Sequence, residues 1–556
     1  MQEECLHFNE LKHHIKTIEE NRTMKRRELI KGLSLLPIAG AVSGTSVESA
    51  FAAAPLTQPK AGQSIYEAIG VRPLINARGT VTVVGASQIL PEVQQAMDEA
   101  VKEYVQIDEL MDAVGARLGK LTGAEYGYVS SGASAAITAG TAGCVTGGDP
   151  DKLWMIPDLT GMKDEVIIPA YSRTAYDAAA KAVGVRMVEV SDLNDLKLAI
   201  GPRTAMILVL AGSRSENGPL SLKEISSVAK PLGVPILVDA AAEGLELPNP
   251  HISQGADLVA YSGGKYLRGP QCAGLLIGRK DLIIAARINA GPHHGFGRGF
   301  KVGREEIMGM LAAVEAWHKR DHAGEWKTWV SWGNHIIQRL SKIPGVNTTL
   351  VEPKARSNRA PSVTVKWDKS VIPLTGEDME KLLWDGSPRI AVSGAGSFLP
   401  FPPNLQPNIS VATSSLQAGE EKIIADRLFA ILSKPPMIKR AAGAPAADLS
   451  GQWELEMKFS ASTVNQTLII EQKESALIGT HIASIGSRDL DGTLHGNNVL
   501  IRSSYTKEGV RINYTFTGTV QGNTMQGKVS LSEYGDAEWS AKRHEYRPAG
   551  SPRSRG

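Results

Sequence analysis

The sequence predicts an α/β fold built on a mostly parallel sheet, followed by an antiparallel β-barrel. Between residues 126 and 278, short apolar, β-branched runs alternate with helical periodicity, which is typical of parallel strands covered by helices. From residue 451 onward, apolar residues recur with a period of two, which indicates half-buried antiparallel strands. The chain has 556 residues, so more than one hydrophobic core is expected.

The N-terminal segment is typical of an export signal. Residues 24–31 are basic and include paired arginines, residues 32–42 are apolar, and Ala50-Phe51-Ala52 fits a cleavage site. This order resembles a twin-arginine signal, so we expect recognition by twin-arginine export machinery and a periplasmic location. The alternative is a cytoplasmic protein with a disordered basic tail. No later apolar run approaches the ~20 residues of a membrane span, so no stable span is expected.

Helices are expected where apolar residues recur at helical spacing. Pro91 suits a first turn, and apolar residues from Val93 to Tyr104 predict a helix over 91–104. A second helix is expected near 108–122. Further strands and helices are expected to alternate over 165–169, 175–182, 186–190, 205–210, 222–232, 235–239, 255–260 and 273–278.

A strand, a serine- and glycine-rich turn and a helix are predicted in direct succession. Tyr126–Val129 is the strand, Ser131-Gly132-Ala133-Ser134 is the turn, and small residues as far as Cys144 predict a buried helix. Backbone N–H groups and hydroxyls would then surround one point, which favours a phosphate. The alternative is that the turn serves only as a helix cap.

An acid and a lysine are predicted at neighbouring strand ends. Asp239 ends the strand over 235–239, and Lys265 lies in Ser262-Gly263-Gly264-Lys265, after the strand over 255–260. Ligands of α/β proteins bind at this sheet edge. An acid there can keep a pyridine nitrogen protonated, and a lysine can form a Schiff base with pyridoxal 5'-phosphate (PLP). Either residue alone has an ordinary interpretation, but their order predicts a PLP enzyme.

The C-terminal part changes pattern twice. A helix from Arg304 to Lys319, a strand over 362–367 and a helix over 420–432 indicate a smaller α/β part, which a Pro- and Ala-rich linker closes. Beyond the linker, an up-and-down barrel is expected, as a packing or binding accessory without a catalytic cluster. Its eight predicted strands are 453–459, 467–472, 476–482, 489–494, 498–503, 509–516, 524–531 and 537–543.

Composition excludes several classes of function. Sixty basic and 58 acidic residues give a formal charge of +2, with no long block of one sign after residue 60, so no nucleic-acid partner is expected. Cys5, Cys144 and Cys272 show neither CxxC nor metal-ligand spacing, so no metal site is expected.

Several specific motifs lie within residues 64–433. They are Ile75-Asn76-Ala77-Arg78-Gly79-Thr80, Asp108-Glu109-Leu110, Leu121-Thr122-Gly123-Ala124-Glu125, Ser131-Gly132-Ala133, Gly161-Met162-Lys163, Val238-Asp239-Ala240-Ala241-Ala242-Glu243, Ser262-Gly263-Gly264-Lys265 with Arg268-Gly269-Pro270, and Gly297-Arg298 with Lys301-Val302-Gly303. This set resembles the selenocysteine synthase-related branch of fold-type I PLP enzymes, near its D-glucosaminate-6-phosphate ammonia-lyase-like members.

The resemblance implies an aspartate aminotransferase-like large domain with a smaller α/β domain, and it assigns roles. Lys265 would carry the Schiff base, Asp239 would pair with the pyridine nitrogen, and the 131–134 turn (Ser131, Gly132, Ala133, Ser134) with Ser262 would hold the phosphate. It also implies a homodimer or larger homo-oligomer, with the glycine-rich segment 291–303 expected at the interface.

Two departures from the family pattern bear on function. Ser172-Arg173 stands where a His-Arg pair is expected, so the group that stacks on the cofactor ring is left open. The selenium transferases carry an N-terminal tRNA-binding module, whereas this chain has the export signal there, which argues against tRNA chemistry.

The predicted function is a PLP-dependent lyase, of the ammonia-lyase or dehydratase type. Its small-molecule substrate would be a β-hydroxy amino acid or an amino-sugar acid. The candidate anion clamps are Arg78, Arg173, Arg268 and Arg298, because arginine binds carboxylate or phosphate bidentately; Arg389 is a further candidate. The alternatives are selenium transferase-like, aldolase, racemase or aminotransferase chemistry, or an exported binding protein on a degenerate PLP scaffold.

These patterns predict the domain boundaries. The parts are an N-terminal extension with signal (1–54), a PLP-binding large domain (61–320), a smaller α/β domain (321–434), a linker (435–448) and the barrel (449–546).

Overall fold

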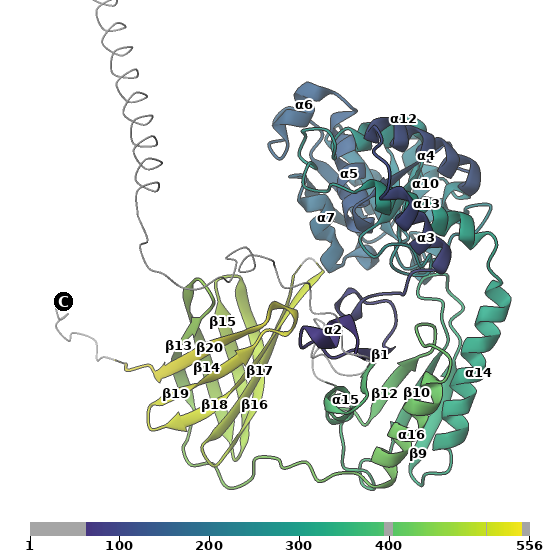
Figure 1. The fold of residues 1–556 in the computed structure, drawn as a ribbon. Coiled ribbons are helices and arrows are strands. Elements are labelled where there is room, and N and C mark those ends of the chain that lie inside the picture. Colours follow the sequence, from purple (N-terminus) through teal and green to yellow (C-terminus); the bar gives the residue numbers. More distant parts are fainter. Residues whose placement is uncertain (1–62, 394–403, 508, 547–556) are drawn as a thin grey trace, which may run out of the picture. The chain divides into compact units, whose positions relative to one another are not determined.

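The computed structural model describes residues 63–393, 404–507 and 509–546 (Figure 1). The predicted export signal lies outside these residues. At the start of the described chain, helix α2 (Ile65–Ala68) begins with a capping box between Ser64 and Glu67.

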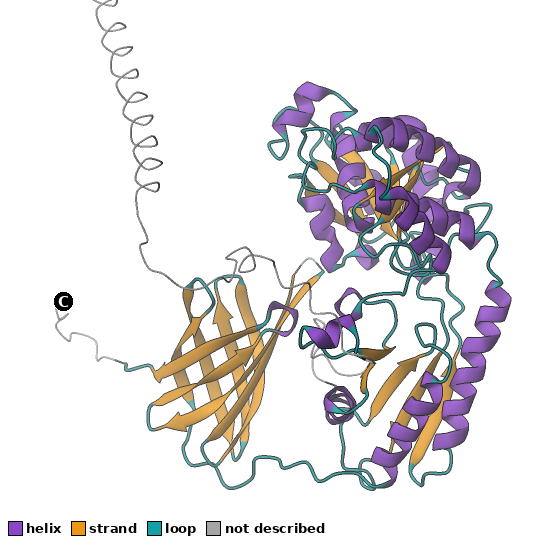
Figure 2. Cartoon of the chain, in the orientation of Figure 1, coloured by secondary structure: helices purple, strands orange, loops and turns teal. Residues whose placement is uncertain are grey.

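A seven-stranded mixed sheet forms the first core, and helices surround it in Figure 2. The strand order is β2-β8-β7-β6-β5-β3-β4, and only β8 runs antiparallel to its neighbours. Most of its residues are fully buried, as expected for a sheet covered on both faces. The strands are β2 Tyr126–Ser130, β3 Glu165–Pro169, β4 Arg186–Val190, β5 Thr204–Leu210, β6 Ile236–Asp239, β7 Leu258–Ser262 and β8 Gly274–Gly278.

The predicted helices of this part form, with some different ends. The helix predicted over 91–104 ends at Ala100, and the Tyr104 side chain is 95% exposed, so no packing extends the helix to it. The helices are α3 Pro91–Ala100, α4 Ile107–Thr122, α5 Gly132–Thr146, α6 Pro150–Met155, α7 Ala178–Lys181, α8 Leu193–Ala199, α9 Ser213–Asn217, α10 Leu222–Ala229, α11 Pro250–Ser253, α12 Lys280–Arg287 and α13 Arg304–Trp317. Short 3-10 turns span Thr82–Val84, Ala170–Ser172, Ala175–Asp177, Lys230–Leu232 and, in the C-terminal part, Ser532–Tyr534.

A second core lies in the smaller α/β part. An antiparallel sheet of order β12-β10-β9 packs with helices α14 and α16. The elements are α14 His322–Leu340, β9 Val346–Val351, β10 Ser362–Trp367, α15 Gly376–Asp385, β11 Arg389–Val392, β12 Asn408–Ala412 and α16 Glu420–Ser433.

One strand near the start of the described chain belongs to this second core. Strand β1 (Leu74–Ala77) pairs in parallel with β11, and its Ile75 and Ala77 side chains pack in the second core. The sequence predicts these residues within the large domain, 61–320. The difference arises because a pairing across about three hundred residues leaves no local pattern in the sequence.

The C-terminal part is a closed, eight-stranded antiparallel barrel in which each strand pairs with the next and β20 closes onto β13 (Figure 1). Inward-facing Trp453, Phe516 and Trp539 fill its interior. The predicted eight-strand pattern is therefore confirmed. The strands are β13 Gly451–Lys458, β14 Thr463–Lys473, β15 Ala476–Ala483, β16 Gly486–His495, β17 Asn498–Lys507, β18 Val510–Gln521, β19 Thr524–Ser530 and β20 Asp536–Arg543.

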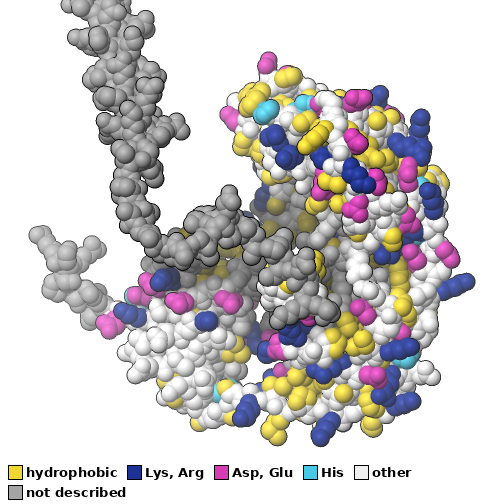
Figure 3. Space-filling view, viewed as in Figure 1, with side chains coloured by type: hydrophobic (Ala, Val, Ile, Leu, Met, Phe, Trp, Pro, Cys, Tyr) yellow, Lys and Arg dark blue, Asp and Glu magenta, His cyan; other side chains and the backbone are white. Residues whose placement is uncertain are grey.

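Acidic and basic side chains are interspersed on the face that Figure 3 shows. Within the described ranges, no helix is both long and apolar enough to cross a membrane, and no group of His, Cys, Asp and Glu side chains could hold a metal ion.

The buried His481 makes barrel stability depend on pH. Burial, together with the charge of Arg488, lowers the pKa of His481 to about 3 from 6.5. Below about pH 6.5, His481 is protonated in the unfolded chain but stays neutral in the folded barrel. The free energy of unfolding therefore falls by up to about 1.4 kcal/mol per pH unit down to about pH 3. Chemical denaturation of the full chain at several pH values, followed by hydrogen exchange of barrel amides, measures this slope.

The variant His481→Gln removes the titrating group and is expected to flatten that slope, whereas His495→Gln, near the β16–β17 turn, serves as the control. An unchanged slope in His481→Gln would contradict the assignment.

Candidate active site

The three motifs predicted to form the site meet at one edge of the seven-stranded sheet. Strands β6 and β7 are parallel, and β2 runs in the same direction because both β2 and β7 are antiparallel to β8. Their carboxyl ends therefore lie at a common edge. Asp239 ends β6, Lys265 follows β7, and Ser131 follows β2. This edge is where α/β sheets bind ligands.

Asp239 is a buried carboxylate at the end of β6. Its side chain Oδ1 accepts a hydrogen bond from the Ala241 N–H at 3.0 Å. Burial raises the pKa of Asp239, the Ala241 hydrogen bond and the positive charge of Lys265 act to lower it, and Glu243 and Asp177 raise it further. A positively charged group beside Asp239 would stabilise the ionised form.

Lys265 sits in a loop that backbone hydrogen bonds hold on both sides. The Gly263 N–H donates to the Ala273 carbonyl at 2.9 Å, and the Gly269 N–H donates to the Gly263 carbonyl at 2.8 Å. A Cβ on Gly263 would lie 2.7 Å from the Ala273 oxygen, so this close approach requires glycine.

The Lys265 amine and the Asp239 carboxylate interact electrostatically. Burial lowers the pKa of Lys265, while the negative charge of Asp239 raises it. The amine is therefore more easily neutral than a solvated lysine, as a nucleophile requires. The pair fits PLP. Lys265 would bond to the aldehyde, and Asp239, a buried acid without sufficient counter-charge, would pair with the protonated ring nitrogen.

The N-terminus of α5 supplies the predicted phosphate position. Ser131 is the N-cap residue, and its side chain makes no capping hydrogen bond. Gly132 has φ +83°, and a Cβ on Gly274 would lie 2.3 Å from the Gly132 carbonyl carbon, so β8 and the helix start are in close backbone contact. Ser134 is exposed and Ala133 is buried, which leaves the hydroxyls and N–H groups of the first turn for an anion.

Ser262 ends β7 beside this position and is half-buried. The roles of the residues at positions 131–134 and 262 stay predictions.

Ser172 and Arg173, which stand where a His-Arg pair was expected, both bond to other residues of this chain. The buried Ser172 Oγ accepts a hydrogen bond from the Leu210 N–H at 3.0 Å. Arg173 pairs with Asp177 at 2.6 Å and with Glu189 at 3.0 Å. Arg173 therefore holds two carboxylates of its own chain.

The other predicted arginine clamps differ in their surroundings. Arg78 is buried and pairs with Glu380 at 3.3 Å, and burial lowers the pKa of Arg78. Arg298 is exposed. Arg389 donates to the Trp384 carbonyl and lies over the Trp384 ring. The structure brings one of them, Arg268, beside Lys265.

A pocket of about 440 Å³ contains Lys265 and Arg268 in its wall. Hydroxyl and amide side chains dominate the rest of it. The Oγ atoms of Ser87 and Ser415 are buried and have no hydrogen-bond partner among the described residues. The remaining wall residues include Thr80, Gln88, Arg320, Asp321, Thr328, Ser414 and Gln417. Sequence reasoning missed Ser415 because it lies in the smaller part, far along the chain, without a motif.

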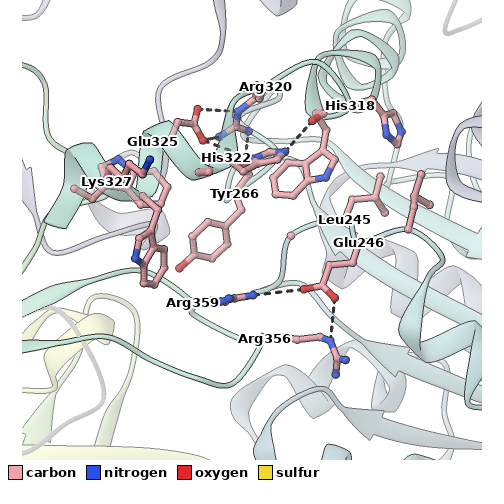
Figure 4. A pocket seen from close by; sticks show the side chains of 16 residues that line it. Leu245, Glu246, Tyr266, His318, Arg320, His322, Glu325, Lys327, Arg356 and Arg359 are labelled. Carbon is pink, nitrogen blue, oxygen red and sulfur yellow. Dashed lines mark hydrogen bonds and ion pairs between the residues drawn. The ribbon is translucent and has the colours of Figure 1, made fainter.

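A larger cavity of about 830 Å³ adjoins this pocket and shares Tyr266, Arg320, Glu325 and Trp329 with it (Figure 4). Its charged groups are mostly paired. Arg320 pairs with Glu325 at 2.7 Å, and Glu246 accepts from Arg356 at 3.2 Å. Neither Lys265 nor Asp239 lines this cavity.

A buried network not foreseen from the sequence stands directly after the strand-end acid. Glu243 Oε2 lies 2.7 Å from His251 Nε2, and Glu243 Oε1 accepts from the Ser357 hydroxyl at 2.9 Å. The Asn358 N–H also donates to the Ala242 carbonyl. This network fixes the segment after Asp239 against residues 357–358.

Comparisons with known proteins agree with this geometry. A family model described as Cys/Met metabolism PLP-dependent enzyme matches residues 90–295. The chain is 32% identical over 333 residues to D-glucosaminate-6-phosphate ammonia lyase of Salmonella typhimurium (strain 14028s / SGSC 2262), covering 58% of this chain and 87% of the relative. It is 26% identical over 294 residues to L-seryl-tRNA(Sec) selenium transferase of Moorella thermoacetica, covering 46% of this chain and 57% of the relative.

A solved structure of D-glucosaminate-6-phosphate ammonia-lyase superposes with a TM-score of 0.58 at 30% identity, covering 67% of this chain and 98% of that one. These matches confirm the predicted resemblance, the fold-type I large domain and PLP as cofactor.

The close contact between Gly274 and the start of α5 predicts that a larger residue at position 274 is harmful. Because the added Cβ of Gly274→Ala meets backbone atoms that cannot turn aside, we expect a loss of about 1–3 kcal/mol in stability and weaker PLP binding. Thermal denaturation and titration of the apoprotein with PLP measure both effects.

The matched control is Gly201→Ala, because a Cβ there meets nothing within 4 Å. Equal behaviour of the two variants would show that the Gly274 contact does not support the phosphate position.

Proposed function

This chain belongs to the family of PLP-dependent enzymes that includes D-glucosaminate-6-phosphate ammonia lyase, and from that premise we propose a lyase acting on a β-hydroxy amino acid or amino-sugar acid. The observation that carries the proposal is the pocket at Lys265. It combines a half-buried amine, one available arginine and unpaired hydroxyls, which suits a substrate bearing an amine, an acid group and several hydroxyls.

Substrate orientation is assigned to the pocket walls. The Arg268 Nε donates to the Gln88 carbonyl at 3.0 Å, and no hydrogen bond to another described residue occupies its Nη groups, which leaves them for a substrate carboxylate or phosphate. The hydroxyls of Ser87 and Ser415 would bind substrate hydroxyls, because buried hydroxyls without partners carry a desolvation cost that such bonds remove.

PLP, when bound, supplies an aldehyde for amines and a ring that withdraws electrons from the substrate Cα. With PLP held there, the Lys265 amine would take the substrate Cα proton as general base. Its lowered pKa favours the neutral form that can accept this proton. Asp239 would keep the ring nitrogen of bound PLP protonated, and the backbone hydrogen bonds around Gly263 hold Lys265 in place.

The β-hydroxyl leaves with the Cα proton as water, and hydrolysis of the resulting unsaturated amine consumes one water and releases ammonia. A β-hydroxy amino acid thus becomes a 2-oxo acid and ammonia, without an external oxidant or reductant.

We propose a homo-oligomer in which the segment 291–303 meets a second copy; the exposed Arg298 in that segment is one group such a contact could use. We also propose export through the twin-arginine route, which rests on the sequence signal alone.

The first test removes the covalent anchor. Purified protein with PLP is expected to absorb in the Schiff-base region and to release ammonia from hydroxylated amino acids or amino-sugar acids. Lys265→Ala is expected to lose both properties, because no other amine replaces the half-buried nucleophile. The control Lys280→Ala, at the exposed start of α12, should keep both. An absorbance band that survives in Lys265→Ala would refute the anchor, and a band without ammonia release would redirect the reaction type.

The second test concerns the strand-end acid. Asp239→Asn keeps the size of the side chain but loses its charge, so we expect the absorbance band to remain while the rate falls by about a hundredfold or more. Asp158→Asn, at an exposed turn, is the control. Steady-state ammonia release measures the rates, and equal rates for the two variants would exclude Asp239 from the reaction.

A further inference from the structure

The barrel interior contains a polar layer near the β15–β16 and β17–β18 turns. His481 pairs in register with Arg488, and Ser503 pairs with Tyr514. Alternation along each strand places these four side chains on the inner face, together with Gln466 of β14, whereas most of that face is apolar.

Arg488 is the unusual member of this layer. The residue is only 7% exposed, and its Nε, Nη1 and Nη2 atoms are buried without a hydrogen-bond partner in the described part of the chain. Its guanidinium lies over two rings, 4.6 Å from the Tyr514 centroid and 5.3 Å from the Tyr505 centroid. Ring faces attract a cation but accept no hydrogen bonds in the guanidinium plane. A buried, unpaired charge is costly, so a missing counter-ion is the simplest explanation.

The neighbouring groups do not neutralise Arg488. Within the described residues, no ion pair joins it to a carboxylate, and the adjacent Asp489 is exposed on the outer face. His481 is held between Ser503 and Gln466 by hydrogen bonds and is neutral at ordinary pH. The layer therefore carries a single positive charge.

Space exists beside this charge. A cavity of about 640 Å³ at this end of the barrel has Arg488, Ser503, Tyr505 and Tyr514 in its wall, together with outer-face residues of β16 and β17 that include Asp489, Asp491 and Arg502. Eight-stranded barrels are of the size that holds one small ligand.

We propose that the barrel binds a small organic carboxylate, whose two oxygens accept hydrogen bonds from the Arg488 guanidinium between Tyr505 and Tyr514. A planar carboxylate matches the fork of a guanidinium. A monoanion is favoured over a phosphate dianion, because the layer offers one cation and a second buried negative charge would have no partner. The site lies in the barrel and does not depend on the reaction at Lys265.

The test titrates the full-length holoenzyme with acetate, benzoate and pyruvate by calorimetry, with chloride and inorganic phosphate as comparison anions. We expect at least one carboxylate to bind, and to bind at least about tenfold more weakly to Arg488→Met. The control is Lys542→Met, which removes an exposed cation of β20 that does not line this cavity and should leave binding unchanged. Carboxylate binding at the Lys265 pocket is common to both variants, so the difference between them reports the barrel alone.

Should Arg488→Met fail to fold, Arg488→Lys keeps the charge without the fork and should still weaken carboxylate binding. Several outcomes would overturn the proposal: no carboxylate binds, titrations are identical in the wild type and the Arg488 variants, binding is lost in Lys542→Met instead, or phosphate binds more tightly than every carboxylate.

Discussion

The site depends on two opposite charges at the same sheet edge, a buried carboxylate and a half-buried amine. Burial raises the pKa of Asp239 and lowers that of Lys265, and each group partly reverses the shift of the other. Burial disfavours the charged form of each group, and parallel strands that end at one edge bring the two groups close together. A cofactor that bonds to the amine and presents a cationic ring nitrogen to the carboxylate satisfies both groups.

Close backbone contact makes this edge possible. Gly263 allows the lysine loop to approach Ala273, and Gly274 allows β8 to touch the first turn of α5. The buried Glu243–His251–Ser357 network holds the chain after Asp239. Small residues and backbone hydrogen bonds, rather than large side chains, therefore set the distances between the reactive groups.

The barrel presents the opposite electrostatic situation. In the α/β part, Arg78 and Arg173 are buried or nearly so, and each has a carboxylate partner. Arg488 is equally buried and faces only rings and neutral groups. The same physical rule, that buried charge needs compensation, explains the paired arginines and motivates the proposed ligand for the unpaired one.

The sequence by itself determined the fold class, the eight barrel strands and the order of the strand-end acid and the lysine, because hydrophobic periodicity and short motifs are local properties of the chain. It misplaced what depends on distant contacts. The helix after Pro91 stops before Tyr104, and β1 joins the second core by pairing with β11.

Only the tertiary structure decided which arginine stands beside Lys265, that Arg78 is committed to Glu380, that Ser415 reaches the pocket, and that Arg488 is left without a counter-charge. Pairing and burial are set by residues far apart in the chain, and no local pattern records them.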